Sequence, residues 1–121
     1  MNDKTIEIVG YGFEVTSTDT RRDFEYNTKP EHKRIVGVFL ATEGDVGLDK
    51  CYVQLSIDNK NIVSYNEVQG SILQKTKYLS VDDAKQEVDV AVNDSRIRLT
   101  MVNKSGMDIK GNLYLIAERN A

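Results

Sequence analysis

Apolar and polar residues alternate with a period of two along nearly the whole chain, and convincing helical periodicity is missing. Val88, Val90 and Val92, for example, alternate with acidic residues, as in a strand with one buried face. The pattern predicts a chain built almost entirely of β-strands. The expected strands cover residues 5–9, 11–16, 22–26, 33–42, 51–57, 62–65, 87–92, 96–102 and 110–118, with a weaker edge segment at 78–81.

Two of these segments, residues 33–42 and 110–118, are apolar on both faces. Strands buried on both sides or central in a sheet have this composition, so we expect both to be internal. Gly10 and Gly12 predict a bulge or bend between the first two strands. Gly37 predicts close approach of a neighbouring chain segment.

The connections are polar and rich in turn-forming residues. Residues 27–32 contain the only proline and are predicted to be a loop. Residues 43–50 contain two glycines and are long enough to cross from one sheet to another, as in Greek-key topologies. Residues 58–61 predict a tight hairpin turn. Residues 66–77 are expected to be an irregular excursion with one short strand or helical turn.

About eight to ten short strands separated by Gly, Asn and Asp turns indicate an all-β, antiparallel sandwich. A jelly roll is the preferred type, because the chain has no Trp and therefore lacks the Cys…Trp…Cys pattern of immunoglobulin domains. A length of 121 residues without an abrupt change in composition predicts one domain over residues 1–121.

The charge balance argues against binding to nucleic acid. The chain has 16 basic and 19 acidic residues, and the basic groups at residues 21–22 and 32–34 are interpreted as solvated strand ends. The N-terminal sequence lacks the apolar run of a signal peptide, and no segment approaches the roughly 20 apolar residues of a membrane span. We therefore expect a cytoplasmic protein without membrane insertion.

Few residues offer catalytic or metal-binding chemistry. Cys51 is the only cysteine, so no intrachain disulfide can form, and its place in an apolar alternation predicts a buried thiol. His32 is the only histidine, which is too few for a cupin-type or zinc centre. The glycines form neither a P-loop nor a dinucleotide-binding pattern. We predict no enzyme, no cofactor and no resident metal.

Calcium and carbohydrate remain alternatives. Residues 58–61 begin like a calcium loop but lack the later glycine and glutamate, so a hairpin turn is the preferred interpretation. Asp45 with Asp49, or the acidic pair at 82–83, could contribute to a calcium site built from separate loops. Tyr52 and Tyr114 are predicted to lie opposite the main apolar face, where aromatic rings bind sugars. Simple coverage of sheet surface by tyrosine is the favoured alternative.

Four segments, KRIVGVFL (33–40), VQLSID (53–58), IRLTMVN (97–103) and GNLYLI (111–116), together resemble small jelly-roll proteins of bacteriophage virions. Members of that group act as capsid subunits, vertex proteins or decoration proteins. The likeness spans roughly two-thirds of the chain and rests on strand texture without an invariant motif.

The resemblance implies a non-catalytic structural protein that acts through protein–protein contacts, as a homo-oligomer or part of a larger virion assembled in the host cytoplasm. The alternative is a carbohydrate-binding or receptor-binding sandwich module. Loops at 27–32, 45–50 and 66–77 are expected to carry the contacts. The candidate partner or ligand contacts are Pro30, His32, Asp45, Asp49, Tyr52 and Tyr114.

Overall fold

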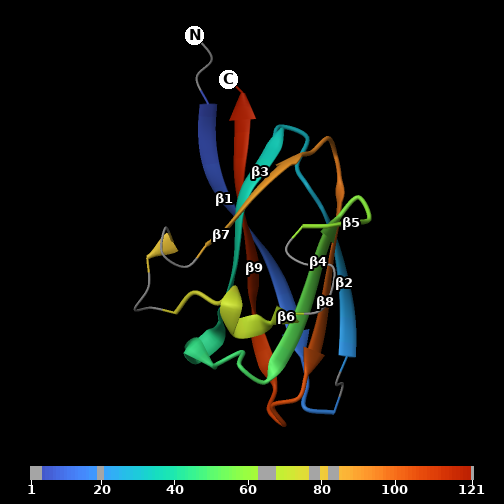
Figure 1. Cartoon of the computed structure of the whole chain (residues 1–121), viewed down its shortest axis with the longest axis vertical. Coiled ribbons are helices and arrows are strands. Elements are labelled where there is room, and N and C mark those ends of the chain that lie inside the picture. Colours follow the sequence, from blue (N-terminus) through green and yellow to red (C-terminus); the bar gives the residue numbers. More distant parts are fainter. Residues whose placement is uncertain (1–3, 19–20, 63–67, 77–79, 82–84, 121) are drawn as a thin grey trace.

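The chain folds into an antiparallel β-sandwich, shown in Figure 1. The computed structural model describes residues 4–18, 21–62, 68–76, 80–81 and 85–120. These residues form nine strands and two 3₁₀ turns, η1 (Glu43–Asp45) and η2 (Gly70–Ile72), which confirms the predicted all-β class. The strands are β1 (Lys4–Val15), β2 (Arg21–Asn27), β3 (Arg34–Thr42), β4 (Cys51–Ile57), β5 (Lys60–Asn61), β6 (Val68–Gln69), β7 (Gln86–Ala91), β8 (Arg96–Asn103) and β9 (Ile109–Asn120).

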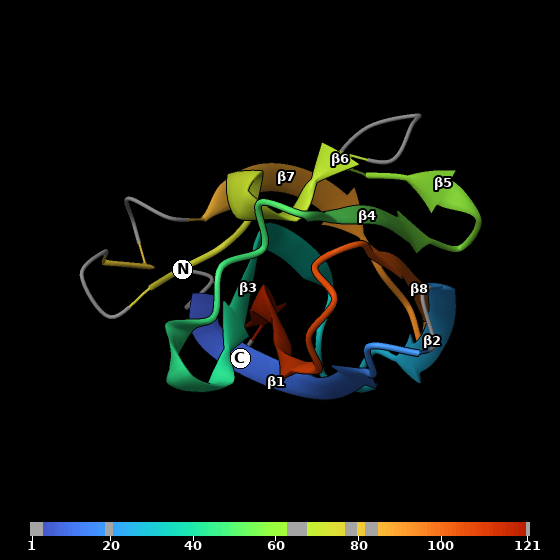
Figure 2. The same cartoon turned by 90° about the horizontal axis from the view of Figure 1, so that it is seen from below.

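The strands form two sheets. Sheet A has the order β1-β9-β3-β7, and sheet B has the order β2-β8-β4-β5 with β6 beside β4. Strands that are consecutive in the chain mostly lie in different sheets, and the loop at 43–50 crosses from sheet A to sheet B as predicted. Figure 2, a view along the long axis, shows how the strands of the two sheets surround a common interior.

The core consists of the inward-facing residues of both sheets. In β8 the side chains of Ile97, Leu99 and Met101 are fully buried, and in β9 Leu113 and Leu115 meet them from the other sheet. Burying a side chain of this size stabilises the fold by about 1.5–3 kcal/mol. Cys51 belongs to the same cluster and is buried, as its sequence position predicted.

The two strands predicted to be internal are internal. β9 lies between β1 and β3, and β3 lies between β9 and β7. Both carry large apolar side chains on their outer faces as well, where Phe39 and Ile116 are 3% and 6% exposed. Gly37 makes room for this packing, since a Cβ there would lie 2.9 Å from Cδ1 of Ile116.

A bulge at Gly10 and Gly12, one of the two predicted irregularities, is absent, so that part of the prediction is wrong. β1 pairs with β9 from Lys4 to Val15 without a register shift, so two expected strands are one. Gly10 instead accommodates a neighbouring ring, since a Cβ would lie 2.9 Å from Cε1 of Tyr114. The bulge in this sheet lies in β3, between Ile35 and Gly37.

The β4–β5 hairpin turn is confirmed. Asp58 and Asn59 have positive φ angles of 51° and 66°, which short hairpin turns require. Oδ1 of Asp58 accepts a hydrogen bond from the backbone N–H of Arg96 at 3.0 Å, which ties the turn to β8. Of the strand expected at 62–65, only residue 62 is among the described residues, and the segments at 78–79 and 82–83 lie outside them.

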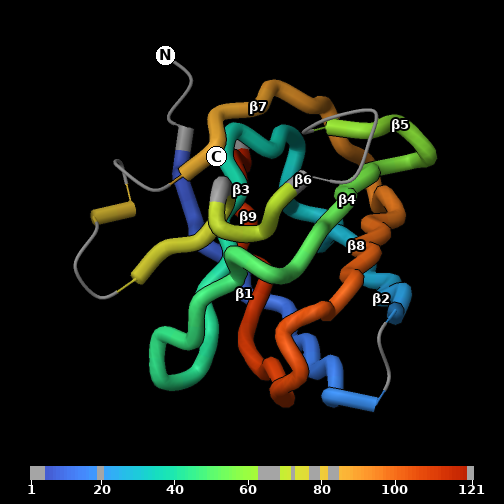
Figure 3. The backbone as a smooth tube through the Cα atoms, turned by 60° about the horizontal axis from the view of Figure 1, so that its bottom comes forward, coloured from blue at the N-terminus to red at the C-terminus, as the bar shows by residue number. Residues whose placement is uncertain are grey.

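The irregular segment predicted at 66–77 contains β6 and η2 in its described part. After η2 the chain returns to sheet A, where Leu40 forms an isolated parallel bridge with Gln74, and Figure 3 traces this path. Among the described residues, no helix is both long and apolar enough to span a membrane.

Candidate interaction surfaces

β1 is an edge strand of sheet A, and side chains of β2 cover only its second half. The Tyr26 hydroxyl donates a hydrogen bond to the backbone carbonyl of Gly12 at 2.7 Å, and Nη1 of Arg22 donates to the carbonyl of Glu14 at 3.0 Å. Burial raises the pKa of Tyr26 to about 12, so its hydroxyl stays protonated and can donate. The second half of the edge is therefore occupied within the chain.

In the first half of β1, the backbone N–H and C=O groups of Ile6 and Ile8 point away from β9, toward the free side of the sheet. In a strand paired on one side, successive residues direct their N–H and C=O groups alternately toward and away from the partner. The carbonyls of Gly12 and Glu14 point away from β9, and the register continues without a shift. Even-numbered residues therefore face the free side, and no described strand pairs with β1 there (Figure 1).

The same two residues carry exposed apolar side chains. Ile6 and Ile8 are 61% and 51% exposed. They begin an apolar stripe across the outer face of sheet A that continues through Ile116, Tyr114 and Phe39. Ile8 lies opposite Ile116 in the register, and the rings of Tyr114 and Phe39 stack with centroids 4.9 Å apart.

His32 belongs to a polar cluster beside β1, so its interpretation as part of a solvated strand end is wrong. The His32 side chain is only 1% exposed, with Nε2 located 3.0 Å from Oε2 of Glu7, so it is not part of a solvated strand end. Nε of Arg119 lies 3.2 Å from the other Glu7 oxygen. The hydrogen bond with His32, aided by the charge of Arg119, lowers the pKa of Glu7. This cluster joins β1, the 27–32 loop and the end of β9.

The outer face of sheet B is polar. The strand register aligns Asp23, Thr100 and Gln54 in one row across β2, β8 and β4. The next row contains Glu25, Arg98, Ser56 and Asn61, in that order.

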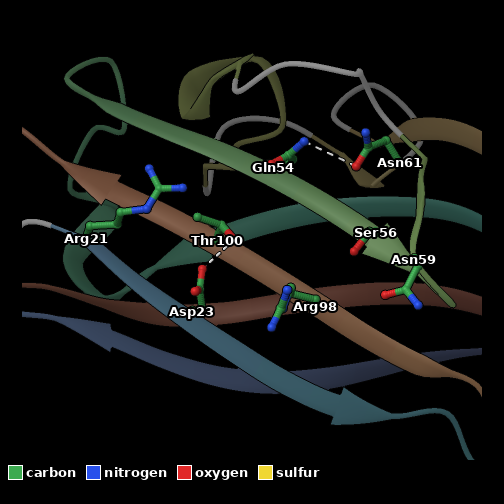
Figure 4. Close-up of a pocket in the computed structure, with 8 residues that line it drawn as sticks. All are labelled: Arg21, Asp23, Gln54, Ser56, Asn59, Asn61, Arg98 and Thr100. Atoms are coloured by element: carbon green, nitrogen blue, oxygen red, sulfur yellow. Dashed lines mark hydrogen bonds between the residues drawn. The ribbon is translucent and has the colours of Figure 1, made fainter.

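The residues of these rows other than Glu25 line a shallow depression of about 290 Å³, the polar hollow. Thr100 donates a hydrogen bond to Oδ1 of Asp23 at 2.6 Å, and Nε2 of Gln54 donates to Oδ1 of Asn61 at 3.2 Å. Figure 4 shows both bonds. The polar hollow is lined by Arg21, Asp23, Gln54, Ser56, Asn59, Asn61, Arg98 and Thr100.

The two candidate tyrosines lie on different outer faces. Tyr52 lies on sheet B, is 37% exposed, and has Nζ of Lys104 above its ring at 5.6 Å. Tyr114 lies on sheet A, stacked on Phe39. Their predicted position opposite the main apolar face is confirmed, but the sandwich separates them.

The other candidate contacts are dispersed. Pro30 is exposed in the loop after β2, Asp45 is half-buried at the end of η1, and Asp49 is exposed before β4. In the part of the chain that the structure describes, no three His, Cys, Asp or Glu side chains gather as a metal site would need.

Sequence reasoning missed both the exposed edge and the polar hollow. The alternation that includes Ile6 and Ile8 matches a buried face equally well, and it cannot tell which face of the strand meets the core. The residues of the polar hollow come from four separate segments, and only strand register brings them together. The alternation of Arg96, Arg98 and Thr100 with apolar residues did indicate an outward polar face on β8.

Comparisons with known proteins do not assign the chain to a family. No protein-family model matches it, and no curated protein does. Among solved structures it is similar to one described as the crystal structure of Drosophila NLP-core, with insight into pentamer formation and histone binding. The identity is 13% over 95% of this chain and 98% of that chain, with a TM-score of 0.33. At this level the similarity carries no argument about function.

Proposed function

We propose that the protein is a non-catalytic jelly-roll subunit that assembles with other protein chains through the first half of β1. The observation that carries the proposal is the coincidence, at Ile6 and Ile8, of outward backbone groups with exposed apolar side chains. An edge of this kind is a template for an added strand. Main-chain hydrogen bonds would give affinity, and the apolar stripe would give specificity.

The order of the strands supports the jelly-roll part of the proposal. A jelly roll is a double-sheet sandwich made from two Greek keys. In this chain β1, β2, β3 and β4 alternate between sheets A and B, β4 is followed in its own sheet by β5 and β6, and β7, β8 and β9 alternate again. β1 thus ends beside β9.

The proposed partner is a second copy of the chain. Two copies of one edge can pair antiparallel about a two-fold axis, so each surface meets its own equivalent. Sheet A would then continue from one copy into the other, with Ile6 and Ile8 of both copies on one face. Proline or a bulge commonly protects an edge, and β1 has neither.

The setting in a bacteriophage virion, assembled in the host cytoplasm, rests on the resemblance of four strand segments to virion jelly rolls. Purified particles from a host that carries this gene test it directly. Mass spectrometry should find the chain in the particles at a stoichiometry fixed by symmetry. Its absence from the particles would contradict the virion setting without affecting the edge.

Light scattering after size-exclusion chromatography tests the assembly. We expect a defined oligomer for the unmodified chain and a monomer for Ile8→Lys, because a lysine on an edge strand opposes pairing with another strand. Met107→Lys is the matched control, since Met107 is 54% exposed but lies in the β8–β9 loop. A monomer at every concentration would overturn self-association.

A proline variant separates backbone pairing from side-chain contact. Ile8→Pro removes an N–H that points to the free side, so the bonds to β9 should persist and the oligomer should dissociate. Val9→Pro removes an N–H that points toward β9 and should instead destabilise the fold. An oligomer that survives both Ile8→Lys and Ile8→Pro would show that the contact lies elsewhere.

A further inference from the structure

The polar hollow on sheet B is lined by long side chains on either side of shorter ones. Arg21 lies one row before the Asp23–Thr100 row, and Arg98 lies one row after it. Two long guanidinium side chains therefore bracket shorter carboxylate and hydroxyl groups (Figure 4). The β4–β5 turn closes one end, because its positive φ angles direct the chain back beside β4 and bring Asn59 and Asn61 to the rim.

Several of these side chains are held in place before any ligand arrives. Thr100 is bonded to Asp23 at 2.6 Å, and Gln54 is bonded to Asn61 at 3.2 Å. Nη2 of Arg98 lies 3.3 Å from Oε1 of Glu25, outside the lining of the hollow. Side chains fixed in this way lose less conformational entropy when a ligand binds.

The chemistry of the lining selects a class of ligand. Every lining residue is polar, so an apolar molecule would gain little there. Asn59, Asn61 and Ser56 present amide and hydroxyl groups that can donate and accept hydrogen bonds, as sugar hydroxyls do. Arginine adds a planar fork of donors suited to a carboxylate. Asp23 and Glu25 oppose an extended polyanion, and the net charge of −3 does the same.

The volume limits the size of the ligand. At about 290 Å³ the hollow lies just below the range for small-molecule sites, which is about 300–1,000 Å³. One sugar ring is the appropriate scale. We propose that the polar hollow binds an acidic monosaccharide unit, such as a hexuronate at the end of a glycan, with either Arg21 or Arg98 facing its carboxylate.

This inference is independent of the proposed assembly, because the hollow and the β1 edge lie on different sheets. Titration of ¹⁵N-labelled protein with galacturonate, followed by NMR, tests it. We expect saturable shifts of the backbone amides of residues 54–56 and 98–100. Galactose, which has a hydroxymethyl group where galacturonate has a carboxylate, should bind at least about tenfold more weakly, because charge-assisted hydrogen bonds are lost.

Variants locate the site. The double substitution Arg21→Gln with Arg98→Gln should weaken galacturonate binding by more than about tenfold while leaving the rest of the spectrum unchanged. Arg96→Gln is the matched control, since Arg96 is exposed on the same strand but lies outside the hollow. It should bind as the unmodified chain does.

Three results would overturn the inference. They are an absence of saturable shifts up to the solubility limit of the sugar, equal affinity for galactose and galacturonate, and unchanged binding by the double variant. Shifts confined to sheet A would place any sugar contact elsewhere and would also contradict it. None of these outcomes bears on the oligomer measured with the Ile8 variants.

Discussion

The outer faces of the two sheets differ although their inner faces share one core. On sheet A, Phe39 and Ile116 are 3% and 6% exposed, and glycines lie beside the large side chains. On sheet B, the corresponding outward positions carry Gln54, Arg98 and other polar groups. Sheet A thus carries buried apolar side chains on both faces, whereas sheet B has an apolar inner face and a mainly polar outer face.

The difference is the basis of the two roles proposed above. The second apolar layer of sheet A ends at Ile6 and Ile8, where side chains and backbone groups are both exposed, and this suits a protein partner. The polar face of sheet B contributes little burial, so its residues are available for recognition of a small polar ligand. Seven substitutions test whether the faces differ in this way.

The largest expected effect is at Phe39. Phe39→Ala should lower the free energy of unfolding by about 3–5 kcal/mol, because a buried aromatic side chain stacked on Tyr114 is lost. Gln54→Ala, at an outward position of sheet B, should change it by less than about 0.5 kcal/mol. Urea unfolding at one fixed protein concentration measures both. Similar values for the two variants would remove the proposed contrast.

The next effect compares two glycines of β1. Gly10→Val should destabilise the fold by about 1–3 kcal/mol, since the new side chain would meet the Tyr114 ring. Gly12→Val should be tolerated, because a Cβ there has its nearest contact at 3.7 Å, with Asn112. Thermal unfolding of both variants measures the difference. Equal losses would mean that the Tyr114 ring is not the reason for the glycine at position 10.

Acid should weaken both sheets through specific carboxylates. The pKa of Glu7 in the folded chain lies below its ordinary value of 4.5 because of His32 and Arg119. Its contribution to stability is therefore complete above about pH 4.5 and is lost as the pH falls through the lowered value. Glu7→Gln should reduce the melting temperature at neutral pH and flatten its decline in acid.

Asp58 provides the sheet B counterpart. Its hydrogen bonds with Ser95 and with the backbone N–H of Arg96 lower its pKa below the ordinary value of 3.8. The contribution of Asp58 to stability is complete above about pH 3.8 and is lost as the pH falls through the lowered value, so Asp58→Asn should flatten the decline in acid. Melting curves from neutral pH to strong acid compare the variants. A decline that is unchanged in both would assign acid sensitivity to other groups.

A small effect is expected at Arg98. Its ion pair with Glu25 is solvent-exposed, so Arg98→Gln should change the free energy of unfolding by less than about 1 kcal/mol. Urea unfolding checks this value. A larger loss would mean that the outer face of sheet B stabilises the fold as the outer face of sheet A does.

The sequence by itself determined the strands and their polarity. Most strand positions, the internal places of β3 and β9, the turn at Asp58 and the burial of Cys51 followed from a period of two and from turn-forming residues. These are local properties, because side-chain alternation and turn conformation depend on neighbours in the chain.

Only the tertiary structure decided which face each strand buries and which strands become neighbours. His32 was expected in solvent but is buried against Glu7, 25 residues away in the chain, and Gly10 lies under a ring from β9 instead of forming a bulge. The exposed edge at Ile6 and the polar hollow follow from register and sheet order. A two-residue period is the same whether its apolar side points inward or outward, so contacts between distant strands settle the choice.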